Sequence, residues 1–136
     1  MLVHPAKRIF YKIPKLRLLL TIESNRICTQ NLSECEPLLE RLRRQKAEGG
    51  FVCAVCAAPT VLERAEVIED ESVTCYPSCT PQMGRPVESV PVIADGQLIT
   101  GQGPGAAMLF ALVVLAHLTD ERTAHGVANG MIAEFS

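Results

Sequence analysis

The chain has 136 residues, of which 48% are hydrophobic and 21% charged, and its formal net charge is −2. This length and apolar fraction fit one globular domain with buried elements and exclude a multidomain protein. The charge is uneven, because residues 1–29 carry a net +5 and the remaining residues a net −7. An acidic body of this kind disfavours binding to nucleic acid.

The basic segment at residues 1–29 has three interpretations: an interaction tail, a mitochondrial-type leader, or an irregular approach to a short strand at 16–22. Its apolar residues recur at helical spacing, but Pro14 interrupts them, and the segment lacks the Ser and Arg richness of a transit peptide. No secretory signal is evident, and the apolar run 106–116 is shorter than the ~20 residues that span a bilayer. We expect a cytoplasmic protein with reduced cysteines, and mitochondrial localisation is the alternative.

Residues 33–48 predict the first long helix, after a polar loop through Asn31. Ser33 and Glu36 fit a capping box, and a glycine pair at 49–50 ends the helical pattern. One face of this helix collects three leucines, Leu38, Leu39 and Leu42.

A strand that turns sharply into a helix is predicted at residues 51–64. The strand is the apolar run 51–55, and Pro59 suits the first turn of the helix. Cys56 lies at the corner, which is the arrangement of a nucleophile elbow, and the helix N-terminus behind it favours the reactive thiolate. Cys56 is therefore the candidate nucleophile, and the Ala57 amide is the candidate oxyanion donor. The alternative is an inert core cysteine.

The chain beyond the elbow begins with an acidic connection at 66–71, a predicted strand at 73–75 and a proline-punctuated loop. A hairpin is then predicted from strands at 90–93 and 97–100, joined by the turn 94–96.

Two helices complete the predicted elements. The first starts at Ala106 and is apolar all round, so we expect it to be buried on most faces. The second follows Thr119, and its large apolar residues are Val127, Met131 and Ile132. Helices that alternate with strands predict a layered α/β fold.

The cysteine spacing allows two further interpretations. Cys53 and Cys56 resemble a redox pair, but an extended strand separates their Cα atoms by ~10 Å, beyond the ~6.8 Å limit of a disulfide. Together with Cys75 and Cys79 they approximate a Cys₄ zinc site. Their neighbours are apolar rather than glycine-rich, and strand alternation points Cys53 into the core, so we expect no bound zinc.

Four stretches in chain order carry a family resemblance. They are 30–34 (Gln-Asn-Leu-Ser-Glu), 56–60 (Cys-Ala-Ala-Pro-Thr), 74–78 (Thr-Cys-Tyr-Pro-Ser) and 95–106, which contains Gly-Pro-Gly. In this order they resemble the ThiJ/PfpI family of the class I glutamine amidotransferase-like superfamily, in the branch of the parkinsonism-associated deglycase. The resemblance implies a divergent segment at 1–29 followed by one domain at 30–136. That domain is expected to be a three-layer α/β sandwich with a mostly parallel, flavodoxin-like sheet, shortened at the N-terminus.

The resemblance also implies a function. Family members use the elbow cysteine on small reactive carbonyls such as methylglyoxal and glyoxal, or on their adducts, without a cofactor. We therefore expect a glyoxalase- or deglycase-type protein that forms a homodimer or otherwise self-associates, with no nucleic-acid or membrane partner. The alternative is a non-catalytic redox-sensing or chaperone-like protein that uses an oxidisable Cys56.

Several family partners of the cysteine are absent from the matching positions. The family has an early glutamate and a Pro-Gly-Gly loop, whereas Glu23 is the only acid before residue 30, and residues 21–25 are not glycine-rich. Tyr76 stands where close relatives have histidine, and a phenol of pKa ~10 is a weak base, so Tyr76 is a weak candidate partner. We expect all three histidines (His4, His117 and His125) to be structural or surface residues, and any enzymatic activity to be weak.

Overall fold

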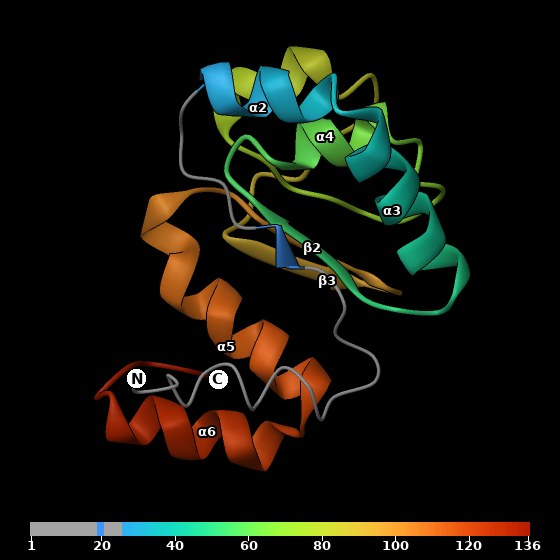
Figure 1. Ribbon diagram of the computed structural model, residues 1–136. Coiled ribbons are helices and arrows are strands. Elements are labelled where there is room, and N and C mark those ends of the chain that lie inside the picture. The colour runs from blue at the N-terminus through green and yellow to red at the C-terminus, as the bar shows by residue number, and fades with distance from the viewer. Residues whose placement is uncertain (1–18, 21–25) are drawn as a thin grey trace, which may run out of the picture.

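Figure 1 shows the computed structural model, which describes residues 19–20 and 26–136. Its strands form one sheet in the order β1–β2–β4–β3. Their bounds are Leu19–Leu20 for β1, Val52–Val55 for β2, Val92–Asp95 for β3 and Leu98–Gly101 for β4. β2 pairs in parallel with both β1 and β4, whereas β3 runs antiparallel to β4. The predicted, mostly parallel sheet is confirmed, and the strand that leads to Cys56 lies inside it.

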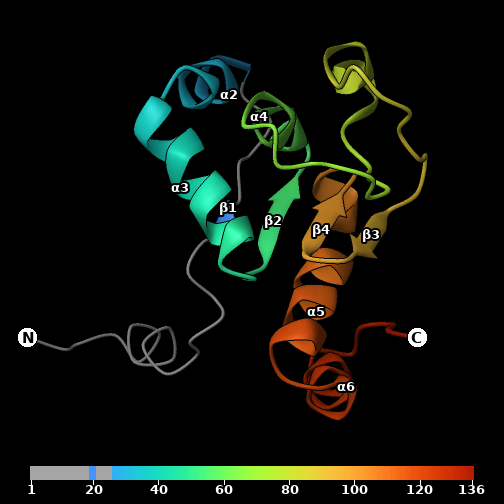
Figure 2. The same cartoon turned by 90° about the vertical axis from the view of Figure 1, so that its right-hand side faces the viewer.

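Helices cover both faces of the sheet (Figures 1 and 2). One face carries α2 (Arg26–Ser33), α3 (Glu36–Ala47) and α4 (Pro59–Arg64). The other face carries α5 (Ala107–Leu118), against which α6 (Glu121–Gly130) packs. Two short 3₁₀ helices are η1 (Pro77–Gln82) and η2 (Pro104–Ala106). The result is the expected three-layer α/β sandwich, and no helix in the described part of the chain is long and apolar enough to cross a membrane.

Strand β2 separates two hydrophobic cores, because successive side chains of a strand point to opposite faces. Val52 and Ala54 belong to the core under α3 and α4, and Cys53 and Val55 belong to the core under α5. The approach of α5 to the sheet is close at Gly101. An added Cβ there would lie 2.9 Å from a methyl carbon of Val55 and 3.0 Å from the Phe110 ring.

The predicted loop and capping box before α3 are wrong. Helix α2 occupies the place of the polar loop, and its polar residues satisfy one another within the helix: the Ser33 hydroxyl donates to the Thr29 carbonyl at 2.8 Å. That bond removes Ser33 from capping, and Cys35 is the N-cap of α3 without a side-chain hydrogen bond. The leucine face is confirmed, since Leu39 and Leu42 are buried and Leu38 is partly buried.

Residues 73–75 are buried but do not form the predicted strand. Thr74 instead uses its amide to bond the Thr100 hydroxyl at 3.0 Å and its own hydroxyl to bond the Val90 carbonyl at 2.9 Å. These side-chain bonds replace a backbone ladder. The hairpin is confirmed, and its turn places Gly96 at φ +56°.

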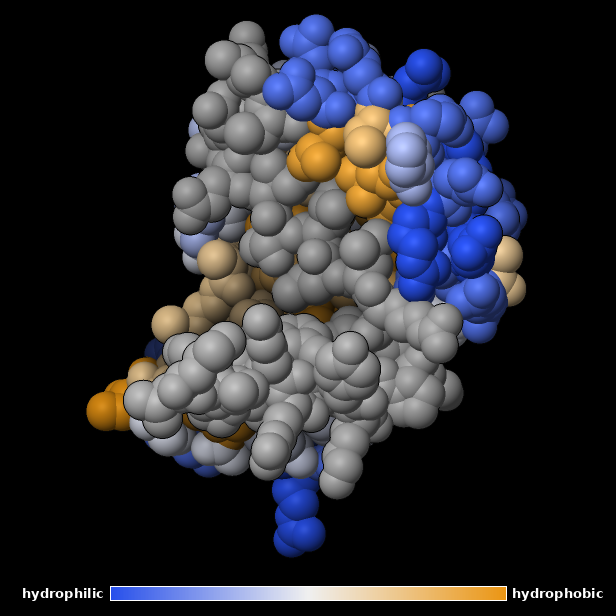
Figure 3. Space-filling model, viewed as in Figure 1, coloured by the Kyte–Doolittle hydropathy of each residue, from blue (hydrophilic) through white to orange (hydrophobic). Residues whose placement is uncertain are grey.

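The two C-terminal helices are less buried than predicted. On α5 only Phe110, Leu112 and Val114 are buried, and Met108 is 51% exposed. On α6 the buried residues are the small Ala124 and Ala128, which allow close packing on α5. The large apolar residues Val127, Met131 and Ile132 are exposed. Figure 3 shows this apolar surface at the C-terminal end of α6, at the lower left.

Three sequence hypotheses concern residues outside the described part of the chain. They are the interpretations of the basic segment at 1–29, of which only 19–20 and 26–29 are described, the strand at 16–22 apart from Leu19 and Leu20, and the roles of Glu23 and His4.

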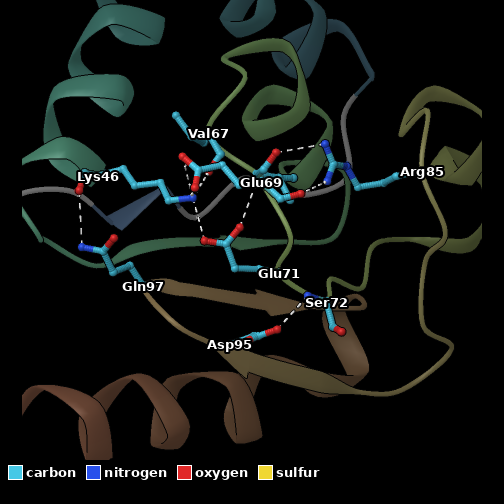
Figure 4. A network of polar contacts seen from close by, with 9 residues as sticks. Lys46, Val67, Glu69, Glu71, Ser72, Arg85, Asp95 and Gln97 are labelled. Carbon is cyan, nitrogen blue, oxygen red and sulfur yellow. Dashed lines mark hydrogen bonds and ion pairs between the residues drawn. The ribbon is translucent and has the colours of Figure 1, made fainter.

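A polar network holds the acidic connection between α4 and Val73 (Figure 4). Lys46 Nζ lies 2.6 Å from the Val67 carbonyl and 2.6 Å from the Glu71 carboxylate. Arg85 joins the Glu63 carboxylate to the carbonyls of Ile68 and Glu69. Burial raises the pKa of Glu71, but hydrogen bonds from Lys46 and backbone amides outweigh it, so the pKa lies below its usual value. The network thereby fixes the path of the chain toward residue 73.

Replacing Lys46 with Met should destabilise the fold by about 2–3 kcal/mol, because hydrogen bonds to charged groups contribute about 1.5–3 kcal/mol each and Glu71 loses its partner. Urea unfolding measures the change. The exposed Arg44→Met on the same helix is the control and should shift stability by less than about 0.5 kcal/mol.

The stability that Glu71 contributes is present above its unfolded pKa of ~4.3 and is lost as pH falls through the lower folded pKa. The Lys46→Met deficit should therefore shrink in acid, and a deficit independent of pH would contradict this account.

Candidate active site around Cys56

The structure places Cys56 at the turn between β2 and α4, as the sequence predicts, and in a left-handed backbone conformation with φ +65°. A non-glycine residue in this region costs about 1–3 kcal/mol and persists only where its surroundings fix it. Two backbone bonds do so here. The Cys56 amide donates to the Gly101 carbonyl at 2.9 Å, and the Tyr76 amide donates to the Cys56 carbonyl at 2.8 Å. The corner therefore depends on β4 and on the segment after Cys75.

The Cys56 thiol is buried, with 2% of the residue exposed. Burial raises its pKa, the Ala57 amide lowers it by hydrogen bonding, and the nearby charge of Cys79 raises it, so the pKa lies above its usual value. The expectation that the corner favours the thiolate is therefore wrong. Helix α4 behind the corner has only six residues. The Ala57 amide bonds the Cys56 thiol, and its role as an oxyanion donor stays a prediction.

Tyr76 meets Cys56 through its backbone, and its ring takes another direction. An added Cβ on Gly103 would lie 3.3 Å from Tyr76 Cδ2, so the ring lies against the Gly-Pro-Gly turn. There it lines a separate hollow of about 360 Å³ together with Pro91 and Pro104. Tyr76 is 42% exposed, and it contacts Cys56 through the backbone hydrogen bond. Its role as a partner of the thiol stays a prediction.

The described histidines lie on α5 and α6, away from the elbow. His117 Nδ1 is 2.8 Å from the Val113 carbonyl, and its ring meets Phe51 edge-on. The His125 ring packs on Phe135. Among the described residues, the influences on the pKa of Cys56 are burial, the Ala57 amide and Cys79, and none is a carboxylate. In this part of the chain the thiol has an amide donor but no resolved acid–base partner.

Cys75 and Cys79 lie within electrostatic range of the Cys56 thiol, and the sequence grouped them with it only as a Cys₄ zinc site. The charge of Cys79 raises the pKa of Cys56, and the charges of Cys79 and Cys56 raise that of Cys75, although burial is the largest influence on both. Cys53 stays apart in the α5 core, where burial raises its pKa to about 12. Within residues 19–20 and 26–136, no group of three His, Cys, Asp or Glu side chains is placed to hold a metal ion, and the absence of zinc stays a prediction.

A cavity of about 630 Å³ opens beside the corner. Its walls come from α2, α4 and η1, and Ala57, Thr60 and Cys79 line the part that adjoins the elbow. Cys56 itself is not among the described residues that line it. Sequence reasoning missed this cavity because it depends on α2, which was predicted to be a loop, and on η1, which was not predicted to be helical.

Comparison with known proteins places this geometry in a family. The profile of the DJ-1/PfpI family matches residues 26–117, more than half of the chain. The chain belongs to the DJ-1/PfpI family. It is 40% identical over 98 residues to Protein dj-1beta of Drosophila melanogaster, a match that covers 70% of this chain and 52% of that protein.

Two other matches agree. Over 90 residues the chain is 38% identical to the Caenorhabditis elegans protein named Glutathione-independent glyoxalase DJR-1.2, a match that covers 64% of this chain and 48% of that protein. The crystal structure of Drosophila melanogaster DJ-1beta superposes with a TM-score of 0.78 at 34% identity, covering 85% of this chain and 63% of that one. The resemblance to a DJ-1/PfpI-type fold is thus confirmed. The chain spans about half the length of these curated relatives.

Alkylation of the native protein should not single out Cys56 at pH 6. We expect the exposed Cys35 to react first, because it is accessible, and Cys53 to react last. Labelling of Cys56 should rise about tenfold per pH unit below its raised pKa, because the thiolate is the reacting form. Peptide mapping after iodoacetamide treatment between pH 6 and 9 measures this order. Preferential labelling of Cys56 at pH 6 would show that the thiolate is stabilised after all.

Proposed function

We propose that the chain is a weak, cofactor-independent cysteine enzyme of the glyoxalase type that acts on small reactive dicarbonyls or their adducts. The observation that carries the proposal is Cys56 in a strained turn with the Ala57 amide bonded to its sulfur. The match to a relative named as a glyoxalase supports the substrate class. The adjoining cavity of about 630 Å³ offers room for such a molecule.

The first step is addition of the Cys56 thiolate to the aldehyde carbon of methylglyoxal. A carbon–sulfur bond forms, the carbonyl π electrons move to oxygen, and the oxyanion accepts a hydrogen bond from the Ala57 amide. A proton then has to leave the carbinol carbon and return at the neighbouring carbon, which produces a thioester that water hydrolyses to lactate. The described residues supply the nucleophile and one oxyanion donor, but no base for the proton transfer.

Turnover of methylglyoxal to lactate should therefore be slow. A missing oxyanion donor costs about 10²–10³ in kcat, and a missing general base about 10²–10⁴. Lactate formation and single-turnover rates should be measured beside a full-length family member. Cys56→Ala should abolish the activity, whereas the matched control Cys53→Ala, in the strand that leads to Cys56, should keep it. Activity that survives Cys56→Ala, or that equals the full-length member, would overturn the proposal.

A redox role is the second candidate function. The observation that favours it is the approach of two further thiols, Cys75 and Cys79, to Cys56. Such a cluster is not needed for carbonyl addition. It gives an oxidised Cys56 neighbours with which it can react.

We also propose that the chain self-associates through the apolar end of α6. Met131 is 50% and Ile132 96% exposed, and exposed apolar patches mark interaction sites. Sedimentation at ~100 µM should show dimers or larger species that dissociate on dilution. Met131→Lys with Ile132→Lys should shift the population to monomer, whereas Glu121→Lys at the other end of α6 should not. A wild-type monomer at this concentration would contradict the proposal.

A further inference from the structure

We infer that Cys79 is the resolving thiol of Cys56: a hydroperoxide oxidises Cys56, and Cys79 converts the product into an intrachain disulfide. The inference rests on the second candidate function, because it needs an oxidisable Cys56. It adds a specific partner to that function and a site of modification in η1.

The backbone holds the two cysteines around one residue, Tyr76. The Tyr76 amide donates to the Cys56 carbonyl at 2.8 Å, and the Cys79 amide donates to the Tyr76 carbonyl at 2.8 Å. Cys79 therefore lies one 3₁₀ turn from a residue bonded directly to the elbow. Both cysteines are free and buried, and the charge of Cys79 acts on Cys56.

Cys79 also has the position and the mobility that a resolving thiol needs. It lines the cavity together with Ala57, the residue that follows Cys56, so a small peroxide in that cavity meets the Cys79 side of the elbow. The other residues of η1 are exposed, so the segment can adjust with little loss of packing. A disulfide requires Cα atoms within about 4.4–6.8 Å of each other, and a short exposed helix can move to meet that limit.

Cys75 is the less suitable partner. Its sulfur already donates to the Tyr76 carbonyl at 3.4 Å and lies 4.0 Å from the Thr80 hydroxyl. It is 2% exposed and is not among the described residues that line the cavity. The Cys75 sulfur lies away from the cavity, and it has to break these hydrogen bonds before it can attack the Cys56 sulfur.

The chemistry balances with a hydroperoxide as the only co-reactant. The Cys56 thiolate attacks one peroxide oxygen, the sulfur–oxygen bond forms, the O–O bond breaks, and the leaving hydroxide or alkoxide takes up a proton. The Cys79 thiolate then attacks the Cys56 sulfur. The S–S bond forms, the S–O bond breaks, and hydroxide leaves to become water. The two sulfurs together lose two electrons, and the peroxide gains them.

The test treats the full chain at pH 8 with a small molar excess of hydrogen peroxide, blocks free thiols, and maps peptides by mass spectrometry. We expect the wild type to lose two hydrogen atoms and to yield a peptide pair that joins Cys56 to Cys79. Cys79→Ala should lose this link and accumulate sulfenic acid at Cys56, detected with dimedone, whereas the matched control Cys75→Ala should keep the link. Circular dichroism and urea unfolding show whether each variant is folded.

Three outcomes would overturn the inference. They are a wild type that accumulates dimedone-reactive Cys56 to the same extent as Cys79→Ala, a link from Cys56 to Cys75, and a wild type in which Cys56 stays unoxidised while exposed Cys35 reacts. Because the readout is a covalent bond, it is independent of lactate formation. A protein without glyoxalase activity can still pass this test, and an active enzyme can still fail it.

Discussion

The left-handed turn at Cys56 is the constraint on which the surrounding structure depends. A residue with a side chain adopts φ +65° only where other parts of the chain hold it there. The holding groups come from far along the sequence: the Gly101 carbonyl at the end of β4 and the Tyr76 amide before η1. Any change that moves β4 along β2, or that releases the segment before Tyr76, relaxes the turn and moves the thiol.

This dependence explains why many polar contacts hold the connection at 66–75, which leads to Tyr76. Residues 73–75 run beside β4 without a backbone ladder, so Thr74 and Thr100 hold them through side chains. The connection that precedes them is fixed by Lys46 from α3 and by Arg85 from beyond η1 (Figure 4). The polar contacts of Lys46 and Arg85 thus help to position the Tyr76 amide that bonds Cys56 at the elbow.

Local patterns predicted the elements that local interactions determine. The apolar run before Cys56, Pro59 after it and the hairpin at Gly96 were all predicted with small shifts, because strand burial, helix initiation and turn geometry act within a few residues. Helix α2 was missed because its polar sequence resembles a loop until tertiary packing supports it. The strand at 73–75 failed for the opposite reason, since an apolar segment can be buried through side-chain bonds alone.

In the candidate site, too, some features follow from the local sequence and others depend on tertiary packing. The corner position of Cys56 follows from a short motif. The pKa does not, because it depends on burial by residues that the motif does not contain. The 3₁₀ helix and the bond to Tyr76 place Cys79 near the elbow, whereas the spacing of cysteines grouped it with Cys56 only as a Cys₄ zinc site.

The glycines between β4 and α5 differ in their tolerance to substitution for reasons that no sequence motif reveals. Gly101 is closed to any side chain by Val55 and Phe110, and Gly103 is restricted by the Tyr76 ring, whereas a Cβ on Gly105 would meet nothing within 4 Å. A set of related sequences could therefore keep a glycine at 101 purely for packing and still vary at 105. Retention of glycine at 103 would report on the aromatic ring at 76, so these two positions should change together.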